Sequence, residues 1–175
     1  VGFLYIRSGV KIKPLIYGGG QQAGLRSGTE NVPGVAGLGV AAKEMYTDHA
    51  AKIQKLTELK DYMTDRLGEI EGTVVNSKKG ADSAPQIVSV SFEGVRSEVL
   101  LHALEDKNIY VSSGSACSSN HPGISGTLKG IGVSQKLLDS TIRMSFSLFN
   151  TKEEIDYTID VLKELVPVLR RYQRG

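Results

Sequence analysis

Hydrophobic positions repeat along the chain in patterns that predict both helices and strands. Apolar residues recur every three or four positions over residues 53–70, which is the spacing of an amphipathic helix. The same spacing over residues 155–169 predicts a final helix, which opens with the capping box Thr151-Lys152-Glu153-Glu154. A third helix is predicted over residues 97–104, with Ser97 as its cap.

Strand-like segments lie between these helices. Residues 73–75, 86–92 and 109–112 are short apolar or alternating runs, and residues 141–147 alternate as a half-buried strand would. One or two short helices are expected within residues 124–139. From about residue 70 onward the order is therefore β, β, α, β, short helices, β, α, which predicts a compact α/β layer with helices over a small sheet.

The beginning of the chain has a different character. Residues 3–7 and 10–17 predict a hairpin around Ser8-Gly9, and residues 18–29 form a glycine-rich loop. A helix of small residues is expected to follow, with Asn31 as its N-cap. Val1 opens directly into a strand-like run without an initiator Met, so we expect a processed chain or a piece of a larger one.

Composition narrows the possible functions. Hydrophobic residues make up 40% of the 175 residues and charged residues 23%, as in soluble globular proteins. The net charge of +2 comes from interleaved signs, so neither a nucleic-acid nor a membrane partner is implied. A single Cys excludes an intrachain disulfide framework and a multi-cysteine metal site, so no metal is expected. Without a secretory segment, the reducing cytosol is the expected compartment.

The single cysteine, Cys117, is the first candidate for chemistry. It lies after a strand-like run among serines and glycines, which cannot fill a core. The thiol could be a redox bystander, but loops of this kind often carry catalytic groups. A nucleophilic thiolate needs a helix N-terminus or nearby cations, and His121, Lys129 and Arg143 are candidates. No arginine follows closely enough for a phosphatase loop, and no nucleophile-elbow or phosphate-loop pattern is found.

Two further features allow both a structural and a functional interpretation. The loop of residues 18–29 could be an exposed turn, or its backbone N–H groups and the Thr29 hydroxyl could hold a phosphate beside the helix that begins near Asn31. Arg143 could lie on the polar face of its strand. On a semi-buried strand, however, its guanidinium would need a carboxylate partner, from the protein or from a ligand.

Several motifs occur together and in order over essentially the whole chain. They are Gly18-Gly19-Gly20-Gln21, Arg26-Ser27-Gly28-Thr29-Glu30-Asn31, Ser112-Ser113-Gly114-Ser115-Ala116-Cys117-Ser118, Thr141-Ile142-Arg143-Met144-Ser145 and Thr151-Lys152-Glu153-Glu154-Ile155-Asp156. As a set they resemble the C-terminal part of a cysteine desulfurase, a pyridoxal phosphate (PLP) enzyme of the class V aminotransferase type that includes the NifS- and IscS-like proteins.

The resemblance implies a role for three residues. Cys117 would attack the sulfur of the cofactor-bound substrate L-cysteine, leaving L-alanine, and would carry the sulfur as a persulfide. Arg143 would bind the substrate carboxylate. Thr29 would donate to the cofactor phosphate of the neighbouring subunit of a homodimer. The sulfur would then pass to an acceptor such as an iron–sulfur scaffold protein.

The resemblance also implies two domains and an incomplete site. Residues 1–45 would be the tail of the large PLP-binding domain, and residues 46–175 would be the small C-terminal domain that carries the cysteine loop. The family's Schiff-base lysine, stacking histidine and pyridine-binding aspartate would lie upstream of Val1, so we expect no turnover from this polypeptide alone. Ser147-Leu148-Phe149 stands where some relatives have a glycine.

Two other functions stay open at the level of sequence. One is a selenocysteine lyase-type enzyme, which the serine-rich loop around Cys117 makes less favoured. The other is a non-enzymatic, stand-alone domain that accepts a persulfide on Cys117 and passes it on.

Overall fold

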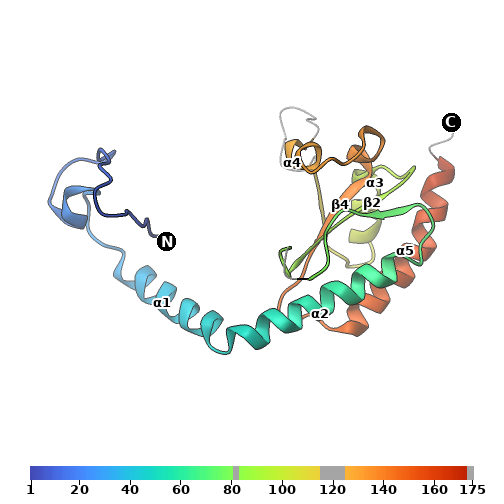
Figure 1. Ribbon diagram of the computed structural model, residues 1–175, viewed down its shortest axis with the longest axis horizontal. Helices are drawn as coiled ribbons and strands as arrows, with labels where there is room; N and C mark the ends of the chain where they lie inside the picture. Colours follow the sequence, from blue (N-terminus) through green and yellow to red (C-terminus); the bar gives the residue numbers. More distant parts are fainter. Residues whose placement is uncertain (81–82, 115–124, 173–175) are drawn as a thin grey trace. The chain divides into compact units, whose positions relative to one another are not determined.

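The computed structural model describes residues 1–80, 83–114 and 125–172, and its chain divides into two compact units, Val1–His49 and Ala50–Gly175. The second unit is built on one four-stranded sheet (Figure 1). Its strands are β1 (Thr73–Val75), β2 (Ile87–Phe92), β3 (Ser112–Ser113) and β4 (Thr141–Ser145). They lie in the order β1-β2-β4-β3, and every neighbouring pair is antiparallel. The expected α/β layer with a small sheet is therefore confirmed.

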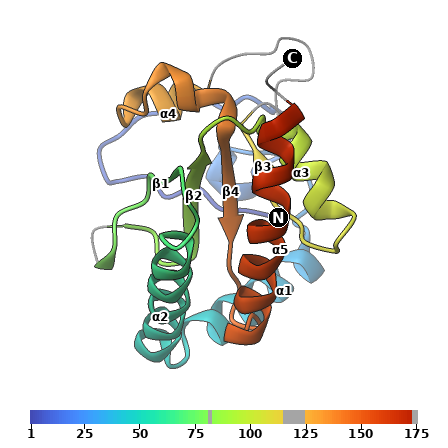
Figure 2. The same ribbon diagram turned by 90° about the vertical axis from the view of Figure 1, so that its right-hand side faces the viewer.

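Helices α2 and α5 lie side by side against this sheet (Figure 2). The helices of the region are α2 (His49–Leu67), α3 (Ser97–Glu105), α4 (Gly126–Gly130), the 3₁₀ helix η3 (Gln135–Ser140) and α5 (Lys152–Tyr172). The two short elements α4 and η3 occupy the region in which one or two short helices were predicted. Gly132, with φ +83°, lies in the turn between them.

The core lies on one face of the sheet because the side chains of each strand alternate between its two faces. From β2, Val88, Val90 and Phe92 are fully buried, and from β4, Ile142 is fully buried next to Met144. The helices supply apolar residues to the same cluster, among them Leu59, Met63, Leu67, Leu100, Leu104, Ile155, Ile159, Leu162 and Val166. Burial of each such side chain contributes roughly 1.5–3 kcal/mol. The predicted three- and four-residue spacing therefore marks the core-facing sides of α2 and α5.

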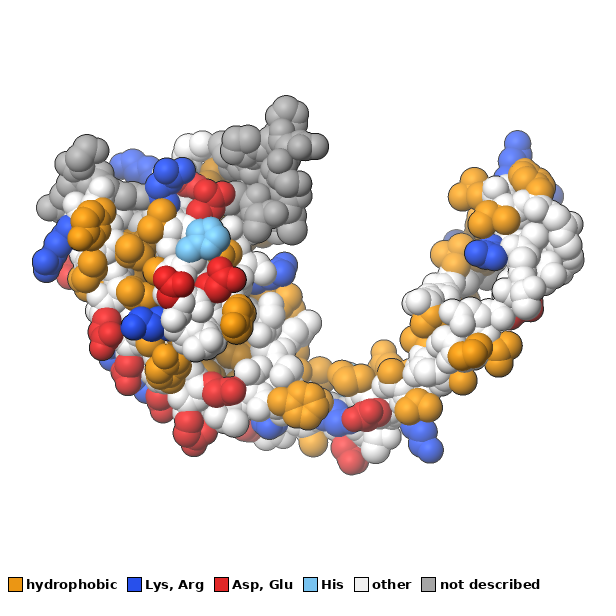
Figure 3. All heavy atoms as spheres, turned by 180° about the vertical axis from the view of Figure 1, so that it is seen from behind, with side chains coloured by type: hydrophobic (Ala, Val, Ile, Leu, Met, Phe, Trp, Pro, Cys, Tyr) orange, Lys and Arg blue, Asp and Glu red, His pale blue; other side chains and the backbone are white. Residues whose placement is uncertain are grey.

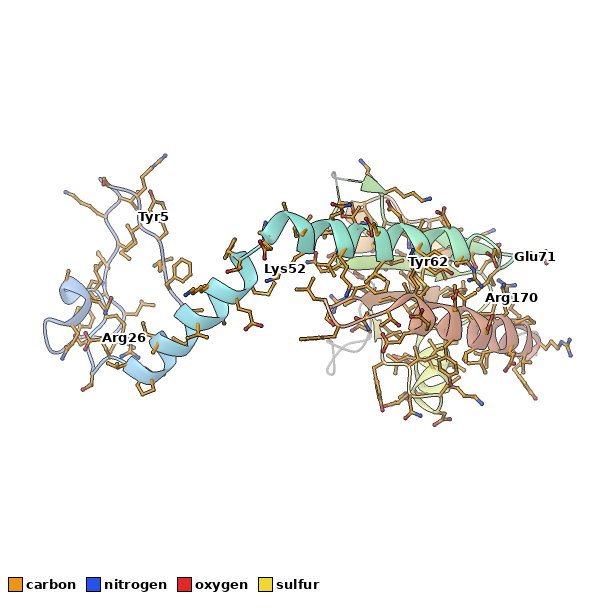
Figure 4. The ribbon with its side chains drawn as sticks, turned by 90° about the horizontal axis from the view of Figure 1, so that it is seen from below. Tyr5, Arg26, Lys52, Tyr62, Glu71 and Arg170 are labelled. Carbon is orange, nitrogen blue, oxygen red and sulfur yellow. The ribbon has the colours of Figure 1, made fainter. Side chains whose placement is uncertain are left out.

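Polar contacts fix α5 against α2 at the edge of this core. The Tyr62 hydroxyl donates to Asp156 over 2.7 Å, and Arg66 forms an ion pair with the same carboxylate. Near the other end of α5, Arg170 donates to the backbone carbonyl of Glu71 over 2.6 Å (Figure 4). These bonds fix the register of the two helices, which the apolar cluster alone does not define.

The start of α5 is the predicted capping box. The backbone N–H of Glu154 donates to Thr151 Oγ1 over 3.4 Å, and the backbone N–H of Thr151 donates to Glu154 Oε2 over 3.1 Å. The prediction for α3 is wrong by one residue. Ser97 is the first helical residue, and the preceding Arg96 caps the helix without a side-chain hydrogen bond.

We expect Thr151→Ala to lower the free energy of unfolding by about 1 kcal/mol, because it leaves a backbone N–H of the first turn of α5 without its acceptor. Chemical denaturation followed by circular dichroism measures this loss. Thr158→Ala is the matched control. The Thr158 hydroxyl donates to the Glu154 carbonyl within the same helix, so its removal should cost less than about 0.5 kcal/mol. Equal losses in the two variants would contradict a capping role.

The first unit contains the 3₁₀ helix η1 (Gln21–Gly24) and helix α1 (Val32–Tyr46). The predicted cap is confirmed, since the Gly34 N–H donates to Asn31 Oδ1 over 3.1 Å. Helix α1 ends at Tyr46 with Thr47 as its C-cap, and Asp48, with φ +51°, lies between this cap and α2. No residue of α1 is buried, and apolar side chains lie at the surface of this unit (Figure 3).

The predicted hairpin is wrong in its strands and right in its turn. Val10 N–H donates to the Arg7 carbonyl over 3.1 Å, and Gly9 has a φ of +88°, so the chain turns at Ser8-Gly9. No strand is assigned to residues 3–7 or 10–17. Their apolar side chains, such as Phe3 and Leu15, are exposed, and a two-stranded ribbon without a packing surface is only marginally stable.

The predicted strand 109–112 is also shorter than expected, because only Ser112 and Ser113 pair with β4. Residues 109–111 are not paired with any strand of the described sheet.

Within the described ranges, none of the helices has both the length and the apolar character that crossing a membrane requires.

Candidate functional site

Arg143 lies on the sheet face opposite the core. The side chains of β4 alternate, so the buried Ile142 and Met144 face the helices while the exposed Arg143 between them faces away. Of the two interpretations of Arg143, the structure therefore agrees with the polar face of the strand. The strand is half-buried, as its pattern predicted, but Arg143 belongs to the uncovered half.

The immediate neighbours of Arg143 are two serines. The register pairs Arg143 with Ser89 of β2 on one side and with Ser112 of β3 on the other. Directly opposed residues of antiparallel strands point to the same face, so the three side chains form one row across the sheet. Arg143 Nη2 donates to Ser112 Oγ over 3.4 Å. Because both neighbours are small, they leave the guanidinium uncovered.

Arg143 has no ion-pair partner among the residues that the structure describes. A guanidinium carries five N–H donors in a planar fork that matches a carboxylate bidentately. The hydrogen bond to Ser112 uses one of these donors. The remaining donors are available to an anionic ligand on this face of the sheet.

A chain of buried hydroxyl groups fixes the sheet beside this row. Asn76 Nδ2 donates to Ser91 Oγ over 2.9 Å, and Ser91 Oγ lies 2.7 Å from Thr141 Oγ1. Thr141 Oγ1 in turn donates to the Leu137 carbonyl over 2.7 Å. Because Ser91 and Thr141 are buried and bonded, the start of β4 is held in place two residues before Arg143.

Cys117 and His121 lie outside the described residues, but the two chain ends that flank them are described. The chain leaves β3 at Gly114 and returns at Ser125, the N-cap of α4. A Cβ built on Gly114 would lie 3.5 Å from the Ser125 Cβ, so the two flanking residues are in contact. Of the other two expected cations, Arg143 lies on the strand next to β3 and Lys129 lies in α4.

A groove of about 810 Å³ lies on the same unit, and it does not include Arg143 or Ser112 among its lining residues. Residues 107–111 and the first turns of α5 line it, with Glu153 and Glu154. The Asn150 amide holds the pKa of Glu154 below its usual value, and a backbone hydrogen bond in the first turn does the same for Glu153. Two ionised carboxylates oppose a carboxylate ligand, so we assign carboxylate binding to Arg143 and not to this groove.

Lys60 is a second side chain of potential chemical interest because burial lowers its pKa, as in amine nucleophiles. It is fully buried, however, and its Nζ donates to Ser83 Oγ over 2.6 Å and to the Ala84 carbonyl over 2.9 Å. These bonds satisfy the amine and hold residues 83–84 against α2. Lys60 is therefore a structural residue and does not replace a cofactor-binding lysine.

The glycine-rich loop of residues 18–29 belongs to the first unit. Part of its backbone is bonded within the loop, since the Gly24 N–H donates to the Gly20 carbonyl and the Ser27 N–H to the Ile16 carbonyl. Thr29 is exposed, two residues before the Asn31 cap of α1. The Arg26 guanidinium lies so close to Gly28 that a Cβ there would be 2.7 Å from its Nη1 (Figure 4).

This loop fits a phosphate group. A guanidinium, a hydroxyl and the start of a helix lie within six residues, Arg26 to Asn31, and each favours an anion. Gly28, with φ +112°, allows the close approach of Arg26 that a side chain would prevent. The remainder of a PLP molecule needs a lysine and a partner for its ring, and the loop supplies neither.

The aminotransferase class-V family model matches residues 1–158 of the chain. The chain belongs to this family. It is 39% identical over 170 residues to "Cysteine desulfurase IscS" of Dictyoglomus turgidum and 39% identical over 169 residues to the protein of the same name of Methanosarcina thermophila. Both alignments cover 97% of this chain, but 43% and 42% of the respective relative. The chain thus spans less than half the length of these relatives.

Solved structures agree with this assignment. A NifS-like protein superposes with a TM-score of 0.79 at 33% identity, over 94% of this chain and 42% of that chain. A NifS-like protein from Rickettsia africae superposes with a TM-score of 0.76 at 29% identity, over 89% and 40% of the two chains. The resemblance to class V enzymes of the cysteine desulfurase type, inferred from five short motifs, is confirmed. The roles of Cys117, Arg143 and Thr29 stay predictions.

Ser112 was part of a recognised motif, but the sequence alone gave it no role of its own. Its contact with Arg143 depends on the pairing of β3 with β4, and 31 positions separate the two residues in the chain. The only local signal was the small, polar character of the residues on both strands. Such residues are also typical of ordinary loops and strand ends.

Proposed function

We propose that the full-length protein, meaning a chain of the relatives' length that carries this sequence, is a PLP-dependent cysteine desulfurase. It converts L-cysteine to L-alanine and holds the sulfur as a persulfide on Cys117. One observation carries this proposal. Arg143, an exposed guanidinium without an ion-pair partner among the described residues, lies directly opposite Ser112, at the base of the segment that bears the only cysteine of the chain.

Chain length limits how far Cys117 can lie from Ser112, the neighbour of Arg143. Cys117 follows Ser112 by five positions, so chain geometry alone keeps their Cα atoms within about 17 Å. Arg143 binds the carboxylate of L-cysteine through its remaining N–H donors and thereby fixes the orientation of the substrate. The same orientation determines where the substrate sulfur lies relative to the thiol.

Cys117 acts as the nucleophile. Its thiolate attacks the sulfur of L-cysteine, and a new S–S bond forms while the C–S bond of the substrate breaks. The electron pair of the broken C–S bond stays with the β-carbon of the substrate. This carbon takes up a proton and becomes the methyl group of L-alanine. The sum is L-cysteine plus a thiol giving L-alanine plus a persulfide, so atoms and electrons balance. PLP, when bound, supplies the electron sink for the bond cleavage.

Residues 1–45 would belong to the large PLP-binding domain and residues 46–175 to the small domain. Thr29, with Arg26 three positions before it in the same loop, would bind the cofactor phosphate of the neighbouring subunit, so that a homodimer completes each site. The exposed apolar side chains of the first unit support its burial in a larger domain. The chain alone would be inactive because the lysine that anchors PLP is not among its residues. The persulfide sulfur would pass to an acceptor such as an iron–sulfur scaffold protein.

Product analysis tests this proposal. The PLP-loaded full-length protein, given L-cysteine and a thiol reductant, should form L-alanine and sulfide in equal amounts. Release of pyruvate and ammonia in place of L-alanine would indicate a lyase of another type and would contradict the proposal. A preference for L-selenocysteine with little turnover of L-cysteine would favour the selenocysteine lyase alternative.

A further inference from the structure

We propose that Ser112 is a positioning residue that orients the Arg143 guanidinium for the substrate carboxylate. This inference rests on the proposed function, in which Arg143 binds that carboxylate. It adds a residue of β3 to the site and gives the first serine of the cysteine-bearing motif a role separate from that of the thiol.

The need for such a residue follows from the exposure of Arg143. A long side chain on an uncovered sheet face can adopt many rotamers. Binding of a ligand restricts it to one of them, and this loss of conformational entropy weakens binding. Arg143 Nη2 donates to Ser112 Oγ over 3.4 Å, which favours rotamers that extend along the row toward β3. The other guanidinium N–H groups keep their fork geometry and are available to a bidentate carboxylate.

Ser112 is itself held in place by its neighbours. The next residue, Ser113, is buried opposite the fully buried Ile142, on the core face of the same strand pair. Because successive residues of a strand point to opposite faces, burial of Ser113 fixes Ser112 on the face of Arg143. The hydroxyl thus projects from a strand residue whose face is set by pairing with β4, as a positioning group requires.

Ser89, on the other side of Arg143, is a matched comparison. It lies in the same row and is the same residue type, but its hydroxyl accepts a hydrogen bond from Asn76 Nδ2 over 3.4 Å. Its backbone N–H donates to Ser77 Oγ over 2.8 Å. These bonds tie Ser89 to the segment that follows β1. The two serines therefore differ in the partner of the hydroxyl, although both lie directly opposite Arg143 in the sheet register.

The test compares Ser112→Ala with Ser89→Ala in the PLP-loaded full-length protein. Ser112→Ala should raise the KM for L-cysteine about three- to tenfold, which corresponds to one hydrogen bond, and should leave kcat within about twofold. Ser89→Ala should leave both values within about twofold. Ser112→Thr keeps the hydroxyl and should restore most of the KM. Equal KM values for the two alanine variants would overturn the inference.

A second measurement separates orientation of the guanidinium from general loss of structure. L-Alanine and ethylamine differ by the carboxylate, so their inhibition constants report whether that group is recognised. Ser112→Ala should weaken inhibition by L-alanine about three- to tenfold and leave inhibition by ethylamine within about twofold. Equal weakening of both inhibitors would indicate a structural effect and overturn the inference.

Arg143→Ala distinguishes failure of this inference from failure of the proposed site. If Arg143→Ala raises the KM while Ser112→Ala behaves like Ser89→Ala, Arg143 binds substrate without help from Ser112. If Arg143→Ala leaves the KM unchanged, the assignment of Arg143 is itself wrong and the inference falls with it. When both single variants raise the KM, the double variant should show no more than the loss of Arg143→Ala. Additive losses would contradict a role that acts through Arg143.

Discussion

Replacing Cys117 with alanine in the PLP-loaded full-length protein is expected to lower the rate of sulfide formation from L-cysteine by about 1,000-fold or more. The thiolate is the acceptor of the substrate sulfur, and a methyl group cannot form the S–S bond. No other cysteine of this chain can substitute, because Cys117 is its only one. Initial rates of sulfide release in the presence of excess reductant measure the effect.

Cys117→Ser serves as the chemically matched control for this prediction. A serine hydroxyl keeps the size and polarity of the side chain but is not ionised near neutral pH, so this variant should be as inactive as Cys117→Ala. Both variants should bind L-alanine as the wild type does, since the Arg143 row is unchanged. Sulfide release at the wild-type rate from either variant would show that Cys117 is not the nucleophile.

Arg143→Ala is expected to lower kcat/KM for L-cysteine about ten- to one-hundredfold, mainly through KM. Charge-assisted hydrogen bonds to a carboxylate contribute about 1.5–3 kcal/mol, and alanine removes all of them. The variant should remain folded, because Arg143 is exposed and has no ion-pair partner among the described residues. Steady-state kinetics over a range of L-cysteine concentrations provide the measurement.

Arg143→Lys tests whether the planar fork or the charge alone is required. Lysine keeps the positive charge but loses the bidentate geometry, so kcat/KM should lie between those of the wild type and Arg143→Ala. Ethylamine, which lacks a carboxylate, should inhibit all three proteins equally. An Arg143→Ala variant with an unchanged KM would exclude this residue from carboxylate binding.

The elements of the second unit were largely predictable because their sequence signals are local. The capping box at Thr151, the three- and four-residue spacing of α2 and α5, and the alternation of Ile142, Arg143 and Met144 each reflect contacts within a few residues. The same alternation also indicated that Arg143 lies on the polar face. The alternation could not show how far the guanidinium is exposed, because burial depends on what covers the second face of the sheet.

The strand order and the first unit could not be predicted in the same way. The order β1-β2-β4-β3 places Ser112 beside Arg143, and this pairing joins segments that are distant in the chain. Residues 3–7 and 10–17 have the composition of strands, but β structure also needs a partner surface. Local propensity therefore identified the turn at Ser8-Gly9 and overestimated the strands around it.

Mass spectrometry of the peptide that contains Cys117 tests the central claim most directly. Trypsin cleaves after Lys107 and Lys129, so Cys117 lies within the single peptide of residues 108–129. After the PLP-loaded full-length protein has reacted with L-cysteine without reductant, this peptide should carry one additional sulfur atom, which a reductant removes. L-Alanine formed while the peptide remains unmodified, with the added sulfur on another residue, would contradict the account.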